Sequence, residues 1–126
     1  MKLNNFGNKG EQRTLDIFKK LGFELQSPDW IAINDNKIIF IEVKEKNQRF
    51  KNIDIEGHGL DKSQVYLRQH LYNKTGIQTL LLIFDNTTNQ IFFNYINDLE
   101  LGYYIDTKNG IRIYPIYNFK ELDKYV

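Results

Sequence analysis

Three charged side chains, Asp29, Glu42 and Lys44, have the types and the spacing to form one reactive site. Glu42 and Lys44 are two residues apart, and they directly follow the apolar run Ile38–Ile41. In a β-strand, residues with that spacing lie on the same face. Carboxylates are hard oxygen ligands that suit Mg²⁺, and a neighbouring ammonium stabilises charge on a phosphate. These residue types therefore predict metal-assisted cleavage of a phosphodiester bond.

A tight hairpin is the element that must bring the two carboxylates together. Residues 34–37 read Asn-Asp-Asn-Lys, which is typical of a turn between two β-prone segments. If the middle two residues form the loop, the antiparallel register places Asp29 opposite Glu42. Opposed side chains have Cβ atoms roughly 4.5–5.5 Å apart, and like charges there repel. We therefore expect Lys44, a divalent cation or both to compensate the pair.

Each of these residues has an expected chemical role. A cation between Asp29 and Glu42 would orient the phosphate, activate water and neutralise the leaving oxygen. Lys44 would stabilise the transition state and help to position or deprotonate the water, and the carbonyl of Val43 is a further candidate ligand. The alternative is a structural cluster of ion pairs. We favour the catalytic interpretation because charge appears only at the end of an otherwise apolar strand.

Two helices and a buried strand are predicted around this hairpin. Leu15, Phe18 and Leu21 recur at helical spacing before Gly22, which predicts a helix at about 8–21. A second helix is expected at about 60–74 and a strand buried on both faces at 77–84. A right-handed crossover would make that strand parallel to the one at 37–44.

The remaining segments complete an α/β fold class. The predicted order is an αβββαβ core with a mixed central sheet, followed by a β-rich extension. The charged segment 45–59 is expected to be a loop, with its lone histidine, His58, solvent-exposed and without a function. The other predicted elements are strands at 23–26, 29–34, 37–44, 91–96, 102–106 and 111–117, a hairpin turn at 108–110 and a short helix at 118–126.

Composition limits the classes of protein to consider. A chain of 126 residues with 41% apolar content is expected to form a single domain, residues 1–126, with a core at about 7–84 and the extension at about 85–126. It has no cysteine, no apolar leader and no apolar run long enough for a membrane. We expect a soluble cytoplasmic protein. With 17 basic and 16 acidic residues, any surface for nucleic acid must be local.

Pro28-Asp29, a hairpin and then Glu42-Val43-Lys44 resemble the PD-(D/E)XK nuclease superfamily over about residues 7–84. Together with Gly10-Glu11, Leu-Gly-Phe at 21–23 and Pro-Asp-x-x-Ala at 28–32, they make the chain most similar to archaeal-type Holliday junction resolvases and small phage-type nucleases. The resemblance implies a restriction-endonuclease-like fold for the αβββαβ core. It also implies an endonuclease that uses Mg²⁺, with Mn²⁺ able to substitute, on branched DNA. The resolvases' serine loop has no clear equivalent here.

The same resemblance assigns roles to further residues. Glu11 would be a metal ligand, or a helix N-terminal residue favoured by the macrodipole. Gln64 would lie at the active site and face the sheet, or hydrogen-bond a nearby backbone carbonyl. Several basic residues are candidates to contact DNA phosphates, with a solvated charged face as the alternative. They are Lys46, Arg49, Lys51, Lys62 and Arg68.

Other functions stay open at this stage. One is a sequence-specific restriction-type endonuclease in which residues 85–126 read bases. Another is a non-catalytic nucleic-acid-binding module with the same fold. A homodimer is expected because one small domain has little surface for recognition. Several aromatic residues near the C-terminus form either a dimer surface or the second face of the sheet: Phe92, Phe93, Tyr95, Tyr103, Tyr104, Tyr114 and Tyr117.

Overall fold

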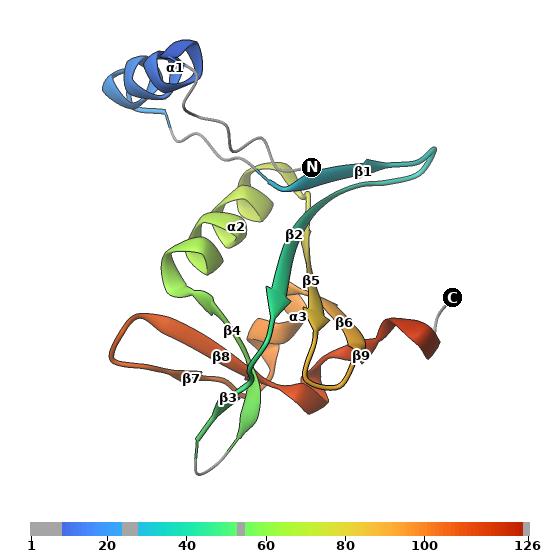
Figure 1. Ribbon diagram of the computed structural model, residues 1–126. Coiled ribbons are helices and arrows are strands. Elements are labelled where there is room, and N and C mark those ends of the chain that lie inside the picture. The colour runs from blue at the N-terminus through green and yellow to red at the C-terminus, as the bar shows by residue number, and fades with distance from the viewer. Residues whose placement is uncertain (1–8, 24–27, 53–54, 125–126) are drawn as a thin grey trace.

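The computed structural model describes residues 9–23, 28–52 and 55–124. Within these residues, the strands form a five-stranded sheet in the order β1-β2-β5-β6-β9 and a four-stranded sheet in the order β3-β4-β8-β7 (Figure 1). The strands are β1 (Trp30–Ile33), β2 (Ile38–Lys46), β3 (Phe50–Lys51), β4 (Glu56–Asp61), β5 (Thr79–Asp85), β6 (Gln90–Tyr95), β7 (Ile105–Asp106), β8 (Ile111–Pro115) and β9 (Lys120–Glu121). The helices are α1 (Lys9–Lys20), α2 (Lys62–Thr75), α3 (Ile96–Leu101) and the 3₁₀ helices η1 (Ile116–Asn118) and η2 (Leu122–Lys124).

The β1–β2 hairpin has the register expected from its turn residues. Ile33 pairs with Ile38, and the backbone N–H of Asn34 donates to the carbonyl of Lys37 at 3.0 Å. The side chain of Asn34 also accepts from the N–H of Asn36 at 2.9 Å, an arrangement in which an asparagine stabilises its own turn. The turn therefore sets which residues lie opposite each other along the whole hairpin.

The crossover through α2 is also as predicted. β2 lies second in its sheet and pairs in parallel with β5, so that Glu42 is the partner of Leu81 and Lys44 the partner of Ile83. Gly76, with φ of 74°, ends α2 in a left-handed conformation that favours glycine. β5 is buried on one face only, because Leu81 and Ile83 are fully buried while Phe84 is 38% exposed, so the expectation of burial on both faces is wrong. The parallel pair fixes the charged end of β2 against this strand.

The prediction of a loop at 45–59 is wrong. β2 extends to Lys46, and the same segment contains β3 and most of β4. The sequence of β4, Glu-Gly-His-Gly-Leu-Asp, has little of the β-branched or aromatic content that marks a strand. Its glycines serve close packing instead, because a Cβ at Gly57 would collide with the backbone carbonyl of Tyr114.

The C-terminal segment contributes strands to both sheets. β6 and β9 complete the five-stranded sheet, while β7 and β8 form the predicted hairpin around 108–110 in the four-stranded sheet. The residues 96–101 form the helix α3, where no helix was expected, and the tail contains β9 and η2 where a short helix was predicted. Six residues are too few for a helical repeat to show in a sequence.

The core lies between the sheets and beneath α2 and α3. Of the C-terminal aromatic residues, Phe92 and Tyr114 belong to the core and Tyr104 packs against it, whereas Tyr103 and Tyr117 are exposed. Its fully buried members pack around the middle of β5. The cluster consists of Leu60, Val65, Leu81, Ile83, Phe92, Ile96, Leu99, Tyr114 and Phe119.

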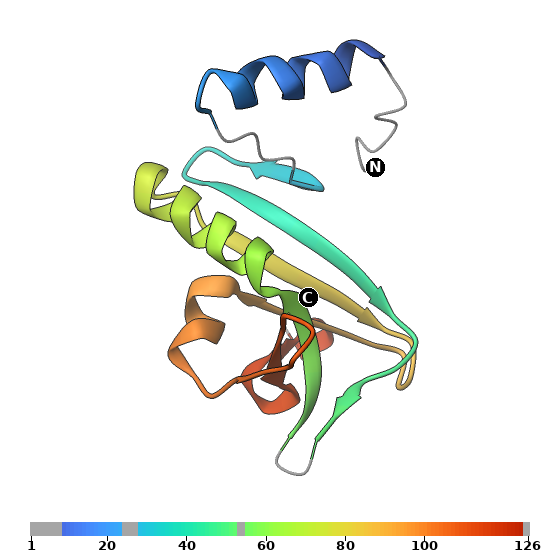
Figure 2. The same ribbon diagram turned by 90° about the vertical axis from the view of Figure 1, so that its left-hand side faces the viewer.

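α1 stands apart from the sheets, as both views show (Figures 1 and 2). Its apolar side chains are exposed, with Ile17 at 51% and Leu21 at 64%. Phe18 and Leu21, two of the apolar residues that predict this helix, are therefore not buried against the sheets. The strand expected at 23–26 falls mostly outside them. No helix in the described part of the chain is long and apolar enough to cross a membrane.

A buried polar cluster joins the two sheets. Asp85, at the end of β5, accepts hydrogen bonds from His58 of β4 at 2.7 Å and from the Nε of Arg49 at 2.7 Å. His58 is fully buried, so the expectation of an exposed loop histidine is wrong. Burial lowers the pKa of His58, which outweighs the opposite effect of Asp85. Burial raises the pKa of Asp85, but hydrogen bonds from Thr87, His58 and Arg49 lower it overall.

This cluster predicts a loss of stability in mild acid. The unfolded chain binds a proton at His58 near pH 6.5, whereas the folded chain does so only at lower pH. The free energy of unfolding should therefore fall as the pH drops from 7.5 to 5.5, measured by urea denaturation. In a His58→Gln variant, which keeps a donor for Asp85, that fall should be smaller. An equal fall in both proteins would contradict this role for His58.

Candidate functional site

The two predicted carboxylates lie side by side at the start of the hairpin. Asp29 directly precedes β1, and continuation of the hairpin register places it opposite Glu42. Both are buried, Asp29 with 8% and Glu42 with 3% of its surface exposed. Oδ2 of Asp29 accepts a hydrogen bond of 2.8 Å from the backbone N–H of Val43. The hairpin thus holds one carboxylate against the residue that follows the other.

The backbone N–H and carbonyl of Val43 face the edge of β2 on which Asp29 lies. Phe40 donates its N–H to the carbonyl of Gln78, and the carbonyl of Lys46 accepts from the residue after β5. The backbone groups of Phe40 and Lys46 therefore form their hydrogen bonds with the β5 side. In a strand, the backbone groups of successive residues point alternately to its two edges. The N–H and the carbonyl of Val43 therefore point to the opposite edge, where Asp29 lies.

Two cations flank Glu42. Nη2 of Arg68 lies 3.0 Å from Oε1, and Nζ of Lys44 lies 3.6 Å from Oε2. Lys44 shares the face of Glu42 because the two are separated by one residue of β2. Its side chain is 24% exposed, while that of Arg68 is only 8% exposed. Lys44 therefore lies between the buried carboxylate and solvent.

Arg68, one of the candidates for phosphate contact, is buried beside Glu42, and its expected contact with DNA stays a prediction. Its position on α2, three residues after the fully buried Val65, places it on the side of the helix that meets the sheet. Leu67, the residue before Arg68, is 38% exposed. The spacing from Val65 was a signal for Arg68, but a charged residue in a helix is usually assigned to the solvent face.

The charged face continues along β2 to Lys46. Burial lowers the pKa of Lys46, and the nearby Lys44 lowers it further, while Asp61 raises it. Lys46 also lies over the ring of Phe50, with Nζ 5.9 Å from the ring centroid. A row of lysines therefore runs from the carboxylates toward β3.

The two remaining predicted site residues belong to the helices α2 and α1. Gln64 is half buried, one turn before Arg68 on the same side of α2. The backbone of Glu11 belongs to α1, but its side chain is outside the described part of the structure. The expectation that Glu11 binds metal therefore stays a prediction.

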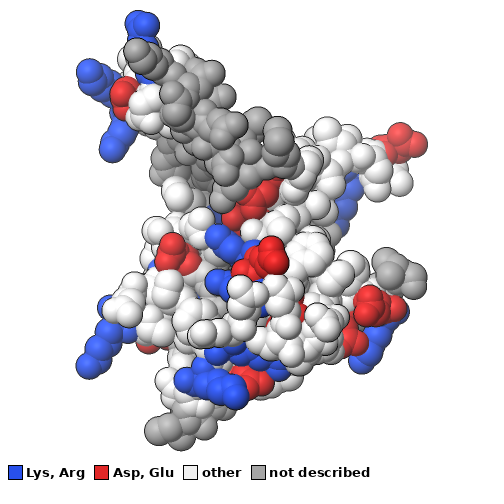
Figure 3. All heavy atoms as spheres, viewed as in Figure 1, with Lys and Arg blue, Asp and Glu red and all other residues white. Residues whose placement is uncertain are grey.

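The remaining candidates for phosphate contact differ in how firmly they are held. The side chain of Arg49 is only 14% exposed and pairs with Asp85 and Glu56. Lys51 is far more accessible, at 75%, and Lys62 lies 3.8 Å from Asp106 at 35%. Figure 3 shows basic and acidic side chains close together on one face of the molecule. Lys51 and Lys62 are therefore the better placed of these three for contact with DNA.

The donor set at Asp29 and Glu42 fits a magnesium ion. The described residues contain no group of three or more histidine, cysteine, aspartate or glutamate side chains suited to a metal. Mg²⁺ does not need one, because it commonly uses one or two carboxylates, keeps several waters and takes substrate phosphates as ligands. Two carboxylates and the edge-facing carbonyl of Val43 meet that requirement.

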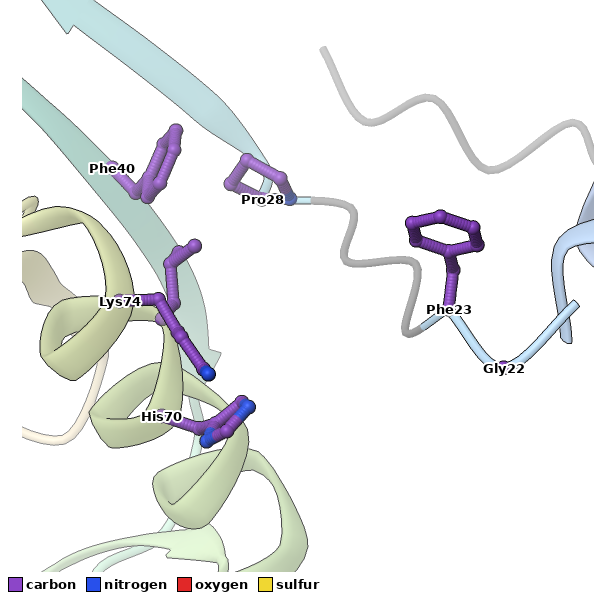
Figure 4. Close-up of a pocket in the computed structure, with 7 residues that line it drawn as sticks. Gly22, Phe23, Pro28, Phe40, His70 and Lys74 are labelled. Atoms are coloured by element: carbon purple, nitrogen blue, oxygen red, sulfur yellow. The ribbon is translucent and has the colours of Figure 1, made fainter.

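An open cleft of about 660 Å³ lies next to the carboxylates. It is lined by Phe40, two residues before Glu42, and by Pro28, the neighbour of Asp29. In Figure 4, His70 and Lys74 extend from α2 on one side, and Phe23 lies on the far side beyond Pro28. The cleft therefore combines apolar walls with basic side chains beside the acidic pair.

Comparison with known proteins identifies the fold. No family model matches the chain, and no curated protein matches its sequence. Among solved structures, the chain is similar to Hjc, a Holliday junction resolvase of the archaeal hyperthermophile Archaeoglobus fulgidus. The TM-score is 0.53 at 16% sequence identity, and the match covers 90% of this chain and 94% of Hjc. The chain thus has a mixed α/β fold like that of Hjc, with a mixed central sheet.

Proposed function

We propose that this protein is a Mg²⁺-dependent endonuclease that hydrolyses phosphodiester bonds in branched DNA. The observation that carries the proposal is the juxtaposition of two buried carboxylates, Asp29 and Glu42, with Lys44 on the same sheet face. The fold shared with a Holliday junction resolvase supports it. We further propose that the chain is a single nuclease domain.

In this proposal, Asp29, Glu42 and the carbonyl of Val43 would hold the ion, with Glu11 as a further ligand from α1. When bound, Mg²⁺ supplies charge neutralisation at the phosphate and a more acidic water. The hydrogen bond from Val43 fixes one oxygen of Asp29, so that the carboxylate is oriented before the substrate arrives. Lys44, partly open to solvent, would contact a non-bridging phosphate oxygen and position the water.

The surface around the carboxylates has the features that a DNA strand requires. His70 and Lys74 line the cleft on one side of the pair, and Lys46 and Lys51 lie toward β3 on the other. Phosphate contacts of this kind provide affinity without reading sequence. A strand that passes from the cleft to β3 would cross the carboxylates on its way.

We also propose that the protein acts as a homodimer. The hairpin exposes three large apolar residues on the face that carries Glu42, with Ile31 at 55%, Ile33 at 71% and Ile38 at 46%. β1 is an edge strand of its sheet, and exposed apolar edges are typical of association surfaces. A second copy would cover this surface and present two sites to a branched substrate.

A non-catalytic nucleic-acid-binding module is the second candidate function. One observation favours it: Arg68 and Lys44 already balance the charges of Asp29 and Glu42. Such a module would bind DNA and never cut it. A cleavage assay therefore separates the two functions directly.

Removal of either carboxylate should abolish cleavage. The wild-type protein should cut a four-way DNA junction with 5 mM Mg²⁺ and not with EDTA. Asp29→Asn and Glu42→Gln should each lower the single-turnover rate by about a thousandfold or more, because the ion contributes several kcal/mol to the transition state. Asp35→Asn, in the hairpin turn, and Glu45→Gln, on the opposite face of β2, are matched controls that should keep wild-type rates.

Binding should survive these substitutions, since phosphate contacts supply most of the affinity. Junction affinity of Asp29→Asn and Glu42→Gln, measured by fluorescence anisotropy with EDTA, should stay within about threefold of wild type. Cleavage that persists in either variant would refute the assigned site. A wild-type protein that binds DNA and cuts nothing would establish the non-catalytic alternative.

Lys44→Met should reduce the rate by roughly 10²- to 10³-fold at saturating Mg²⁺, the usual effect of losing one donor to a developing negative charge. Because the lysine is not expected to bind the ion, added Mg²⁺ should not restore the rate. Lys124→Met, which removes an exposed lysine of η2, is the matched control. A Lys44→Met enzyme with a normal rate would leave the lysine a purely structural partner of Glu42.

A substrate panel tests the preference for branched DNA. Four-way junctions, flaps, linear duplexes and single strands should be compared at equal concentration, and the junction should be cut fastest. Cleavage confined to one duplex sequence, with junctions intact, would replace this proposal by the restriction-type function.

A further inference from the structure

Arg68 is the buried cation of the site that needs explanation. α2 buries only Val65 and Arg68 among its described residues, so a guanidinium occupies a position where an apolar side chain would be the simpler choice. A buried charge is unfavourable unless it is paired and hydrogen-bonded. Its partner is Oε1 of Glu42, at 3.0 Å.

This pairing conflicts with a metal ion at the same oxygen. Glu42 has Arg68 at one oxygen and Lys44 near the other, at 3.6 Å. A cation bound at Oε1 would be repelled by the guanidinium at contact distance, so a move of Arg68 away from this oxygen would favour binding of the ion. Arginine cannot relieve the conflict by losing its proton. It can only change its position.

The guanidinium has a second anion available once substrate is present. Arginine donates through a planar fork that matches the geometry of a phosphate, and it does so better than lysine. A phosphate held at the ion beside Glu42 would lie within the neighbourhood of Arg68, since both would adjoin the same carboxylate. The move from carboxylate to phosphate would keep the buried charge paired throughout.

We infer that Arg68 is a catalytic residue with two positions: it neutralises Glu42 in the free protein and binds the phosphate at the cleaved bond once the ion occupies Glu42. This inference rests on the proposed nuclease function. It assigns Arg68 two effects of opposite direction. Arg68 opposes metal binding in the absence of DNA and accelerates cleavage in its presence.

The test compares Arg68→Met with the wild type in metal binding and in cleavage. Mn²⁺ binding to the full chain without DNA, measured by calorimetry at pH 8, should be about tenfold tighter in Arg68→Met, the factor that one charge-assisted hydrogen bond is worth. The single-turnover cleavage rate at saturating metal should fall by roughly a hundredfold or more. Arg13→Met, which removes an exposed arginine of α1, controls for the change in net charge and should alter neither value.

Arg68→Lys covers the case in which Arg68→Met does not fold, as judged by circular dichroism. Lysine keeps the charge beside Glu42 and lacks the fork, so metal affinity should stay within about threefold of wild type while cleavage slows at least tenfold. Unchanged or weaker metal binding in Arg68→Met, or a wild-type cleavage rate in Arg68→Lys, would overturn the inference. Its failure is distinct from that of the nuclease proposal, which is tested by cleavage with the wild type and with Asp29→Asn and Glu42→Gln.

Discussion

The repulsion between two carboxylates buried on one face of a sheet is the constraint on which this structure depends. Asp29 and Glu42 face each other across the hairpin, where unscreened negative charges are strongly unfavourable. Neighbouring groups compensate this repulsion. Val43 donates its N–H to Asp29, while Lys44 and Arg68 flank Glu42. Such an arrangement adds little to stability compared with apolar packing, which is why a functional purpose is the better explanation.

The remaining elements hold that arrangement in place. β5 pairs in parallel with β2 along its whole length and anchors the charged end of the strand to the core. α2 follows β4 and returns the chain across the sheet, which brings Arg68 over Glu42. The second sheet supports this end of β2 through the buried cluster at Asp85. α1 is the exception, since its apolar residues remain exposed and suited to association.

Local signals in the sequence predicted the hairpin well. The turn at 34–37 set its register, and the apolar run before Asp85 predicted the parallel strand β5. Features that depend on distant contacts were missed. The glycines of β4 suggest a loop in the sequence, whereas in the structure they allow close packing against β8. No local pattern shows that packing. The pairing of Arg68 with Glu42 is likewise not predictable from the sequence, because a charged residue of a helix has an identifiable partner only after α2 is placed on the sheet.

The proposed nuclease requires that Asp29 and Glu42 bind a divalent cation beside Lys44. This binding can be measured by anomalous diffraction from crystals soaked in Mn²⁺ with an uncleavable phosphorothioate strand. We expect an anomalous peak between the two carboxylates, at about 2.0–2.2 Å from their oxygens, with Arg68 turned away from Glu42. An empty site, with Arg68 still bonded to Glu42 at saturating Mn²⁺, would contradict it.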